Sequence, residues 1–214
     1  MIELKNISRE ETIRYLGGAG IELNSAMERL LDVCEEELVR AAVPKYLYKK
    51  IELENSGLIE GEAVKKHLAE CESAYVICAT LGAAIDRLIR SAQVSDMAKA
   101  VVLDAMAGAA IENVCAQLDD LLAEKEDGKY LTWRFAPGYA DYPIELQGKI
   151  LALLDAPRKI GLCTNENSLL TPSKSVTAVV GVSDDPLEKR RRGCAVCNMA
   201  KTCKFRKAGT RCEF

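Results

Sequence analysis

Ser175-Val-Thr-Ala-Val-Val-Gly-Val182 is the stretch of this 214-residue sequence that decides the fold. Valine and threonine fill five of its eight positions, and β-branched side chains favour an extended strand. A second apolar run, residues 74–80, is too short for an amphipathic helix and is typical of a buried central strand. These two segments, far apart in the sequence, are therefore predicted to be strands.

Helical patterns surround the two strands. Residues 83–126 have helical periodicity that breaks near 94–96, where Ser95 or Asp96 suits an N-cap. Alanine and glycine recur along residues 98–116, which predicts close packing against a neighbouring helix or sheet face. The other predicted elements are helices at 8–16, 24–42, 61–70 and 144–155 and strands at 46–53 and 129–135. This order predicts an α+β domain with helices packed on a mainly antiparallel, twisted sheet.

The composition is that of an ordinary globular protein, with 49% hydrophobic and 29% charged residues. Only 5% of the residues are aromatic and the net charge is -3, which argues against a nucleic-acid-binding surface. The opening residues lack the pattern of a signal peptide, and no apolar run approaches the roughly 18 residues of a membrane span. We therefore expect a cytoplasmic protein that binds neither nucleic acid nor membrane.

The charge divides the chain in two near Asp185-Pro186. From residue 187 onward, nine basic and two acidic residues give +7, whereas residues 1–186 have a net charge of -10. Proline discourages the continuation of a preceding strand or helix. We therefore predict a main domain at 1–186 and a basic, cysteine-rich tail at 187–214.

Four of the nine cysteines lie in this tail, at Cys194, Cys197, Cys203 and Cys212. Thiols stay reduced in the cytosol, and four thiolates are the right set for a [4Fe-4S] cluster or a structural zinc ion. Their spacing matches neither a paired zinc ribbon nor the bacterial ferredoxin pattern. An iron-sulfur cluster is the favoured interpretation, and zinc, thiol redox chemistry or a metal-free basic tail are the alternatives.

The common hydrolytic constellations are mostly excluded. The only histidine, His67, lies in a polar predicted helix and is interpreted as a solvated residue rather than a member of a catalytic triad. Neither of the common glycine-rich nucleotide-binding motifs is present. The small residues at 17–20 follow a predicted helix, so they are interpreted as a helix stop.

Residues 133–143 join a predicted strand to a helix through Pro137 and Gly138, with Arg134 and several aromatic residues beside them. Such a turn exposes backbone groups to a ligand, Arg134 could pair with a carboxylate, and Tyr139 could close over the ligand. The alternative is a rigid connection in which Arg134 forms a salt bridge.

Residues 134–139, Arg-Phe-Ala-Pro-Gly-Tyr, resemble the Arg-x-Ala-Pro-Gly-Tyr motif of the S-adenosylmethionine-binding activation domain of cobalamin-dependent methionine synthase. Further landmarks of that family follow in order over about residues 95–185: Leu-Leu-Asp at 153–155, Lys-Ile-Gly-Leu at 159–162, Thr-Asn-Glu at 164–166 and Pro-Ser-Lys-Ser-Val-Thr-Ala at 172–178. The resemblance implies a C-shaped α+β domain that binds S-adenosylmethionine largely through backbone groups of this loop.

By the same resemblance, Arg134 contacts the methionine carboxylate, Ala136, Pro137 and Gly138 form the backbone cradle, and Tyr139 faces the cobalamin. The sequence departs from the family at three places. Ala140 replaces a second proline, the tyrosine pair after the last strand is missing, and the helix position of an acidic ligand residue aligns with Gly108, one turn before Glu112.

The resemblance implies a methyltransferase component that reactivates a cobalamin-dependent methionine synthase or a related corrinoid methyltransferase. One electron and the methyl group of S-adenosylmethionine would restore methylcobalamin from cob(II)alamin. The cobalamin would be presented by a partner protein, since this chain has no Asp-x-His-x-x-Gly motif. Flavodoxin, ferredoxin or the cluster in the tail would supply the electron. The alternative, favoured by the departures, is a non-catalytic adaptor or electron-transfer module for a corrinoid protein.

Overall fold

The computed structural model describes residues 2–4, 7–17, 23–54, 56–187 and 202. A four-stranded antiparallel sheet has the order β1-β2-β6-β3, so the two predicted central strands are adjacent. β2 pairs with β6 along its whole length, from Ser73 opposite Val182 to Thr80 opposite Ser175. The sheet strands are β1 (Lys45–Glu52), β2 (Ser73–Thr80), β3 (Tyr130–Leu131) and β6 (Ser175–Ser183).

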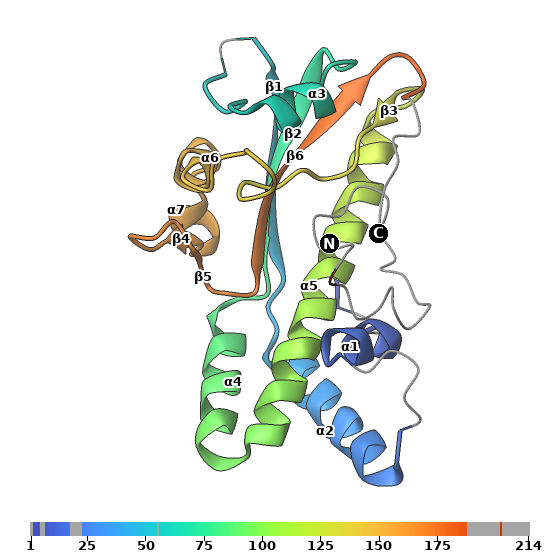
Figure 1. Cartoon of the computed structure of the whole chain (residues 1–214), viewed down its shortest axis with the longest axis vertical. Coiled ribbons are helices and arrows are strands. Elements are labelled where there is room, and N and C mark those ends of the chain that lie inside the picture. The colour runs from blue at the N-terminus through green and yellow to red at the C-terminus, as the bar shows by residue number, and fades with distance from the viewer. Residues whose placement is uncertain (1, 5–6, 18–22, 55, 188–201, 203–214) are drawn as a thin grey trace.

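Helices cover both faces of this sheet, as Figure 1 shows. One layer consists of α1 (Arg9–Tyr15), α2 (Ser25–Ala41), α4 (Ala83–Ser95) and the long α5 (Met97–Lys125). The other layer consists of α6 (Leu146–Leu154) and α7 (Ala156–Ile160), with the hairpin of β4 (Cys163–Thr164) and β5 (Leu170–Thr171) beside them. α3 (Glu62–His67) lies in the connection between β1 and β2. The predicted α+β class is confirmed.

Two apolar cores result because alternate residues of a strand face opposite sides of the sheet. Ile77 and Val180 belong to the core beneath α5, whereas Val76 and Val179 belong to the core beneath α6. β2 is buried at all eight positions, as expected for a strand covered on both faces.

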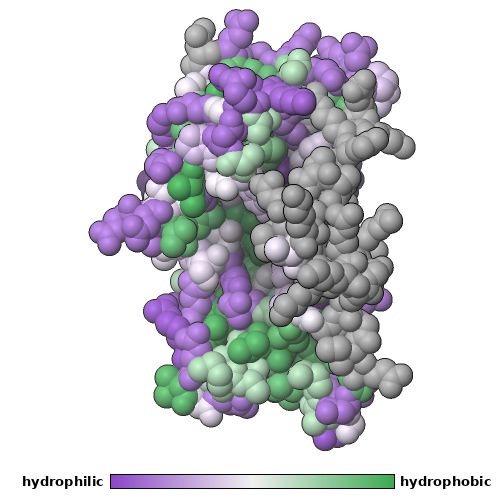
Figure 2. Space-filling view, viewed as in Figure 1, coloured by the Kyte–Doolittle hydropathy of each residue, from purple (hydrophilic) through white to green (hydrophobic). Residues whose placement is uncertain are grey.

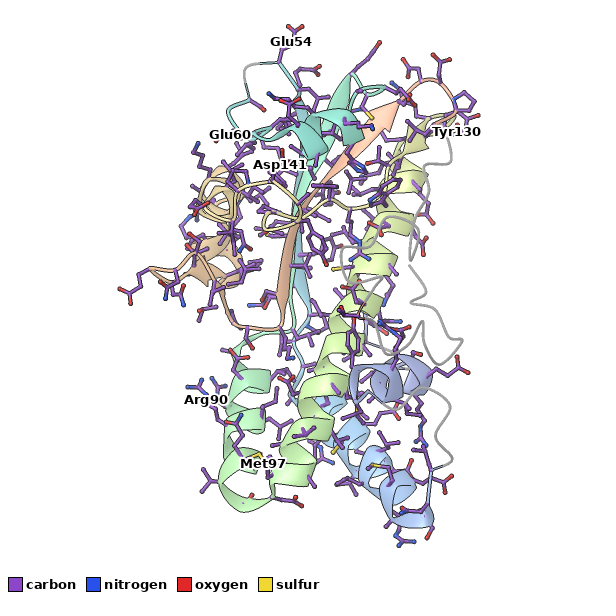
Figure 3. The ribbon with its side chains drawn as sticks, viewed as in Figure 1. Glu54, Glu60, Arg90, Met97, Tyr130 and Asp141 are labelled. Carbon is purple, nitrogen blue, oxygen red and sulfur yellow. The ribbon has the colours of Figure 1, made fainter. Side chains whose placement is uncertain are left out.

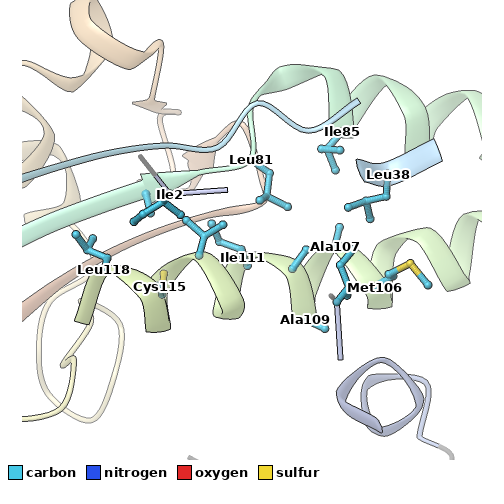
Figure 4. Packing of buried hydrophobic residues seen from close by; sticks show 14 of the residues in the cluster. Ile2, Leu38, Leu81, Ile85, Met106, Ala107, Ala109, Ile111, Cys115 and Leu118 are labelled. Carbon is cyan, nitrogen blue, oxygen red and sulfur yellow. The ribbon is translucent and has the colours of Figure 1, made fainter. Parts of the chain in front are cut away.

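α5 is the axis of the larger core (Figure 4). Asp96 caps it by accepting a hydrogen bond from the Lys99 N–H at 3.0 Å, which confirms the predicted break between two helices. Its small residues allow close packing, and a Cβ added to Gly108 would lie 3.6 Å from the Tyr15 ring of α1. The expectation that this small-residue stretch packs closely is confirmed.

α5 qualifies the expectation that no apolar run approaches the length of a membrane span, because charged residues such as Asp104 and Glu112 interrupt it but its mean hydropathy is high. α5 is long and apolar enough to span a membrane by length and composition, and it is the only such helix in the part of the chain described. However, 61% of its most apolar 18-residue window is buried inside the protein. A core helix satisfies the same two criteria, so this feature is weak evidence for a membrane span.

Candidate functional site

The predicted strand at 129–135 is a two-residue strand followed by a β-bulge. Continuing the ladder from Leu131 opposite Val182 would place Arg134 opposite Val179, but Phe135 takes that position. Phe135 and Val179 exchange backbone hydrogen bonds of 2.9 and 3.0 Å. The extra residue redirects the chain, which bulges commonly do beside functional sites.

Thr132 explains why the regular ladder stops here. Its N–H donates to the Gly181 carbonyl at 2.9 Å, and its own hydroxyl Oγ1 accepts from the Gly181 N–H at 2.8 Å. The Thr132 hydroxyl therefore takes the place of the backbone carbonyl that would accept this hydrogen bond in a regular strand. No pattern of residue types in the sequence predicts such a replacement.

The segment 136–142 then forms a compact turn. The Gly138 N–H donates to the Tyr142 carbonyl at 2.8 Å, and the Tyr142 N–H donates to the Tyr139 carbonyl at 2.9 Å. Gly138 has φ +93°, a conformation that favours glycine. Within the described residues, the Ala136 N–H and the Gly138 carbonyl have no hydrogen-bond partner. These groups are thus available to a ligand.

The tip of this turn faces solvent while its base is anchored. Tyr139 is 67% exposed, and Gly138 is exposed as well. Pro137 and Tyr142 are buried, and the Tyr142 hydroxyl donates to the Leu58 carbonyl at 3.0 Å. The loop therefore presents an exposed aromatic ring on a rigid base.

Arg134 forms salt bridges with two carboxylates of α5. Its Nη2 lies 2.9 Å from Glu112 Oε2 and its Nε lies 3.0 Å from Asp119 Oδ2. Glu112 and Asp119 are seven residues apart, so they share one face of the helix. The salt bridges that the alternative interpretation expected are present, and they use only two of the five guanidinium donors.

Asp119 has one oxygen without a partner. Its Oδ1 is buried and accepts no hydrogen bond from any residue that the structure describes. Burial is the main cause that raises the pKa of Asp119, and Glu112 adds to the effect while Arg134 opposes it. Cys115 lies between the two acids, and burial raises the pKa of its thiol to about 12, so the thiol stays neutral at pH 7.

A pocket of about 500 Å³ adjoins this cluster, a volume within the usual range of ligand pockets. α5 contributes Asp104, Gly108 and Glu112 to its lining, and residues 173–175 and Tyr15 of α1 line it as well. Glu112 therefore belongs both to the pocket and to the Arg134 salt bridge.

One ion pair and three hydrogen bonds fix the wall at 173–175. Lys174 Nζ lies 2.9 Å from Asp104 Oδ1 and also donates to the Asp104 carbonyl at 2.9 Å. Asp86 of α4 accepts hydrogen bonds from the Ser173 N–H at 2.9 Å and from its hydroxyl at 2.6 Å. The wall is thereby fixed to both α4 and α5.

The pocket opens toward an apolar area where α4 meets α5. Val94, Met97 and Val101 are 91%, 61% and 52% exposed, and the last two also line the pocket. Figure 2 shows hydrophobic side chains at this lower end of the face. The pocket thus has a polar end at Glu112 and an apolar end at Met97.

No protein-family model matches this sequence, and no curated protein matches it. Among solved structures, it is similar to the crystal structure of the MetH reactivation domain bound to AdoHcy, with a TM-score of 0.59 and 16% identity. The match covers 85% of this chain and 75% of the other. The chain has the fold of the MetH reactivation domain. This confirms the fold that the sequence resemblance implied.

Within this fold, both segments predicted from the sequence reach α5. The loop at 134–139 does so through Arg134, and the Pro-Ser-Lys-Ser segment does so through the pocket wall at 173–175. Asp119 was not among the predicted site residues, although its spacing of seven from Glu112 indicates that both acids share one face of α5.

His67 and the tail cysteines are the remaining predicted residues. His67 is only 5% exposed and contacts Trp133, so its interpretation as a solvated residue was wrong. The four tail cysteines lie outside the described residues, and the described part of the chain has no group of three His, Cys, Asp or Glu residues that could hold a metal. The tail metal site remains a prediction.

Proposed function

We propose that this chain is a reactivating methyltransferase component that remethylates the corrinoid of a cobalamin-dependent methionine synthase, or of a related corrinoid methyltransferase, with S-adenosylmethionine. The main support is the position of the Arg134–Tyr139 loop. It pairs with β6 through Phe135 and contacts the pocket residue Glu112 through Arg134, in a fold shared with a domain whose structure contains AdoHcy.

The residues present fit such a ligand. Glu112, which lines the pocket, offers an acceptor for its cationic groups, and Arg134 retains donors for its carboxylate. The Ala136 N–H and the Gly138 carbonyl offer one donor and one acceptor. Tyr139, exposed at the tip, would lie at the edge that meets the corrinoid protein.

The proposed reaction transfers a methyl cation equivalent. One electron from a donor protein or cluster reduces cob(II)alamin, the C–S bond of the sulfonium breaks, and the methyl group passes to cobalt, which leaves S-adenosylhomocysteine. The chain's own contribution is to bind and orient the sulfonium, because positioning replaces a bimolecular encounter. No side-chain acid or base is needed.

One observation favours the adaptor alternative. Arg134 is already bound to Glu112 and Asp119, so a ligand carboxylate must share or displace these partners. If the exchange is too costly, the loop does not bind S-adenosylmethionine, and the chain acts only as an adaptor for a corrinoid protein.

Isothermal titration with S-adenosylmethionine and S-adenosylhomocysteine distinguishes the reactivating methyltransferase component from the adaptor. We expect the wild type to bind both, and Arg134→Ala to weaken binding at least tenfold through loss of a charge-assisted contact. Arg158→Ala is the matched control, since Arg158 pairs with Asp155 and its side chain is 77% exposed. A wild type that releases no heat with either ligand supports the adaptor.

We further propose that the four tail cysteines hold a [4Fe-4S] cluster that supplies the electron. Nearby basic residues would offset the negative charge of a four-thiolate cluster and tend to raise its potential. Anaerobic purification followed by iron, sulfide and zinc assays tests this. About four irons, lost in Cys197→Ser, would support the relay, whereas a colourless protein with one zinc would leave the electron to flavodoxin or ferredoxin.

A further inference from the structure

α3 contacts the two ends of the Arg134–Tyr139 loop. At the first end, His67 Nε2 lies 2.8 Å from the Trp133 carbonyl, the last carbonyl before Arg134. A carbonyl can only accept, so His67 Nε2 bears the proton and donates it. The last residue of α3 therefore fixes the backbone immediately before the bulge that redirects Arg134.

The His67 ring is also enclosed by two rings of the same segment. Its centroid lies 4.5 Å from that of Trp133 and 4.9 Å from that of Phe135. A polar ring that is 5% exposed costs free energy unless its donor is satisfied. The hydrogen bond to Trp133 meets this requirement and gives His67 one defined orientation.

At the second end of the loop, Asp141 binds the beginning of α3. Its Oδ2 accepts from the Glu62 N–H at 2.7 Å and its Oδ1 accepts from the Ala63 N–H at 3.0 Å. Figure 3 shows Asp141 close to Glu60, which precedes this helix. Because these amides have no acceptor within their own helix, Asp141 acts as the cap that α3 lacks.

We propose that His67 and Asp141 are positioning residues for S-adenosylmethionine, and we call this pair of contacts the α3 clasp. The inference rests on the proposed function of the loop. Neither residue lines the pocket, so each acts through the backbone at 133–142. A clasp at both ends keeps the Ala136 and Gly138 groups in place before the ligand arrives, which lowers the ordering cost of binding.

Four variants test the clasp. His67→Phe keeps a ring but removes the donor, whereas His67→Gln removes the ring but keeps a donor near the Nε2 position. Asp141→Ala removes the cap at the other end. Asn24→Ala is the matched control, because Asn24 caps α2 through the Met27 N–H at 2.9 Å, far along the chain from the loop.

Two measurements are made on each full-length variant: the affinity for S-adenosylmethionine, and the hydrogen exchange of the Gly138 and Tyr142 amides. We expect His67→Phe and Asp141→Ala to weaken binding about tenfold and to speed exchange of both amides. His67→Gln should stay within about threefold of the wild-type affinity if the donor decides the effect. Asn24→Ala should lower the melting temperature without changing either quantity.

The two readouts separate the clasp from the proposed function. If the wild type does not bind S-adenosylmethionine, the proposed function fails. Faster amide exchange in His67→Phe would then still show that the α3 clasp holds the loop in place. Wild-type affinity and exchange in both His67→Phe and Asp141→Ala would overturn the clasp. If His67→Phe does not fold, the comparison of Asp141→Ala with His67→Gln decides the same question.

Discussion

Gly61→Ala is the substitution that tests most directly whether α3 and the loop are fitted to each other. Gly61 has φ +106° and ψ 146°, a region open almost only to glycine. A Cβ at this position would lie 2.6 Å from the Asp141 backbone oxygen, a contact that cannot be relieved by rotating a side chain. The substitution therefore adds backbone strain and also pushes α3 away from the loop.

The expected cost follows from these two effects. Strain in this region costs about 2–3 kcal/mol, and forcing an extra carbon into a packed contact costs about 1–3 kcal/mol. We expect a total near 4 kcal/mol, which lowers the melting temperature of a chain of this size by roughly 10 °C.

Gly57→Ala is the matched control, because Gly57 lies in the same connection, has φ +63° and has no atom of a non-adjacent described residue within 4 Å of an added Cβ. It should cost only the strain of a left-handed alanine, about 1–2 kcal/mol. Chemical denaturation gives both free energies of unfolding, and hydrogen exchange of the Tyr142 amide reports on the loop. Equal losses in the two variants, with unchanged exchange in Gly61→Ala, would refute the proposed fit.

Three further outcomes are expected. Burial is the main cause that raises the pKa of Tyr75 to about 12, so the folded state favours the neutral phenol. The protein should therefore lose stability as the pH rises from about 10 to 12. Tyr75→Phe should remove this loss in melting curves recorded at alkaline pH. Peptide mapping after brief alkylation at pH 8 should label exposed Cys163 well before buried Cys78, whose pKa burial raises to about 12. Gln147→Leu should cost about 1–3 kcal/mol in denaturation, because Gln147 accepts a hydrogen bond from the buried Thr177 hydroxyl at 3.0 Å.

The parts of the fold predicted correctly are those where local chemistry and the tertiary structure agree. β2 and β6 are apolar on both faces because helices cover both, and Asp96 ends one helix and caps the next through its own side chain. The short strand β3 was predicted too long because its end depends on the Thr132 hydroxyl and Gly181, which are 49 residues apart.

For the candidate site, the sequence pointed to some of the residues and not to others. The motif identified Arg134 and the turn at 136–139, but neither Asp119 nor His67 was assigned a role. Asp119 matters because α5 runs beside the bulge, and His67 is buried because Trp133 and Phe135 enclose it. The spacing of seven places Asp119 on the helix face of Glu112, but single-sequence periodicity does not predict which other segment contacts that face, or which residues enclose His67.

The loop lies between the two layers of the protein and is held by both. Arg134 joins it to α5 on one side of the sheet, and Phe135 packs in the core beneath α6 on the other. A ligand that binds the loop therefore finds its backbone groups already ordered, and the main rearrangement left is at the Arg134 salt bridges. Affinity should then depend on how easily Glu112 and Asp119 accept a new cation in place of Arg134. Glu112 is the better placed of the two for this exchange, since it lines the pocket and its side chain is 46% exposed.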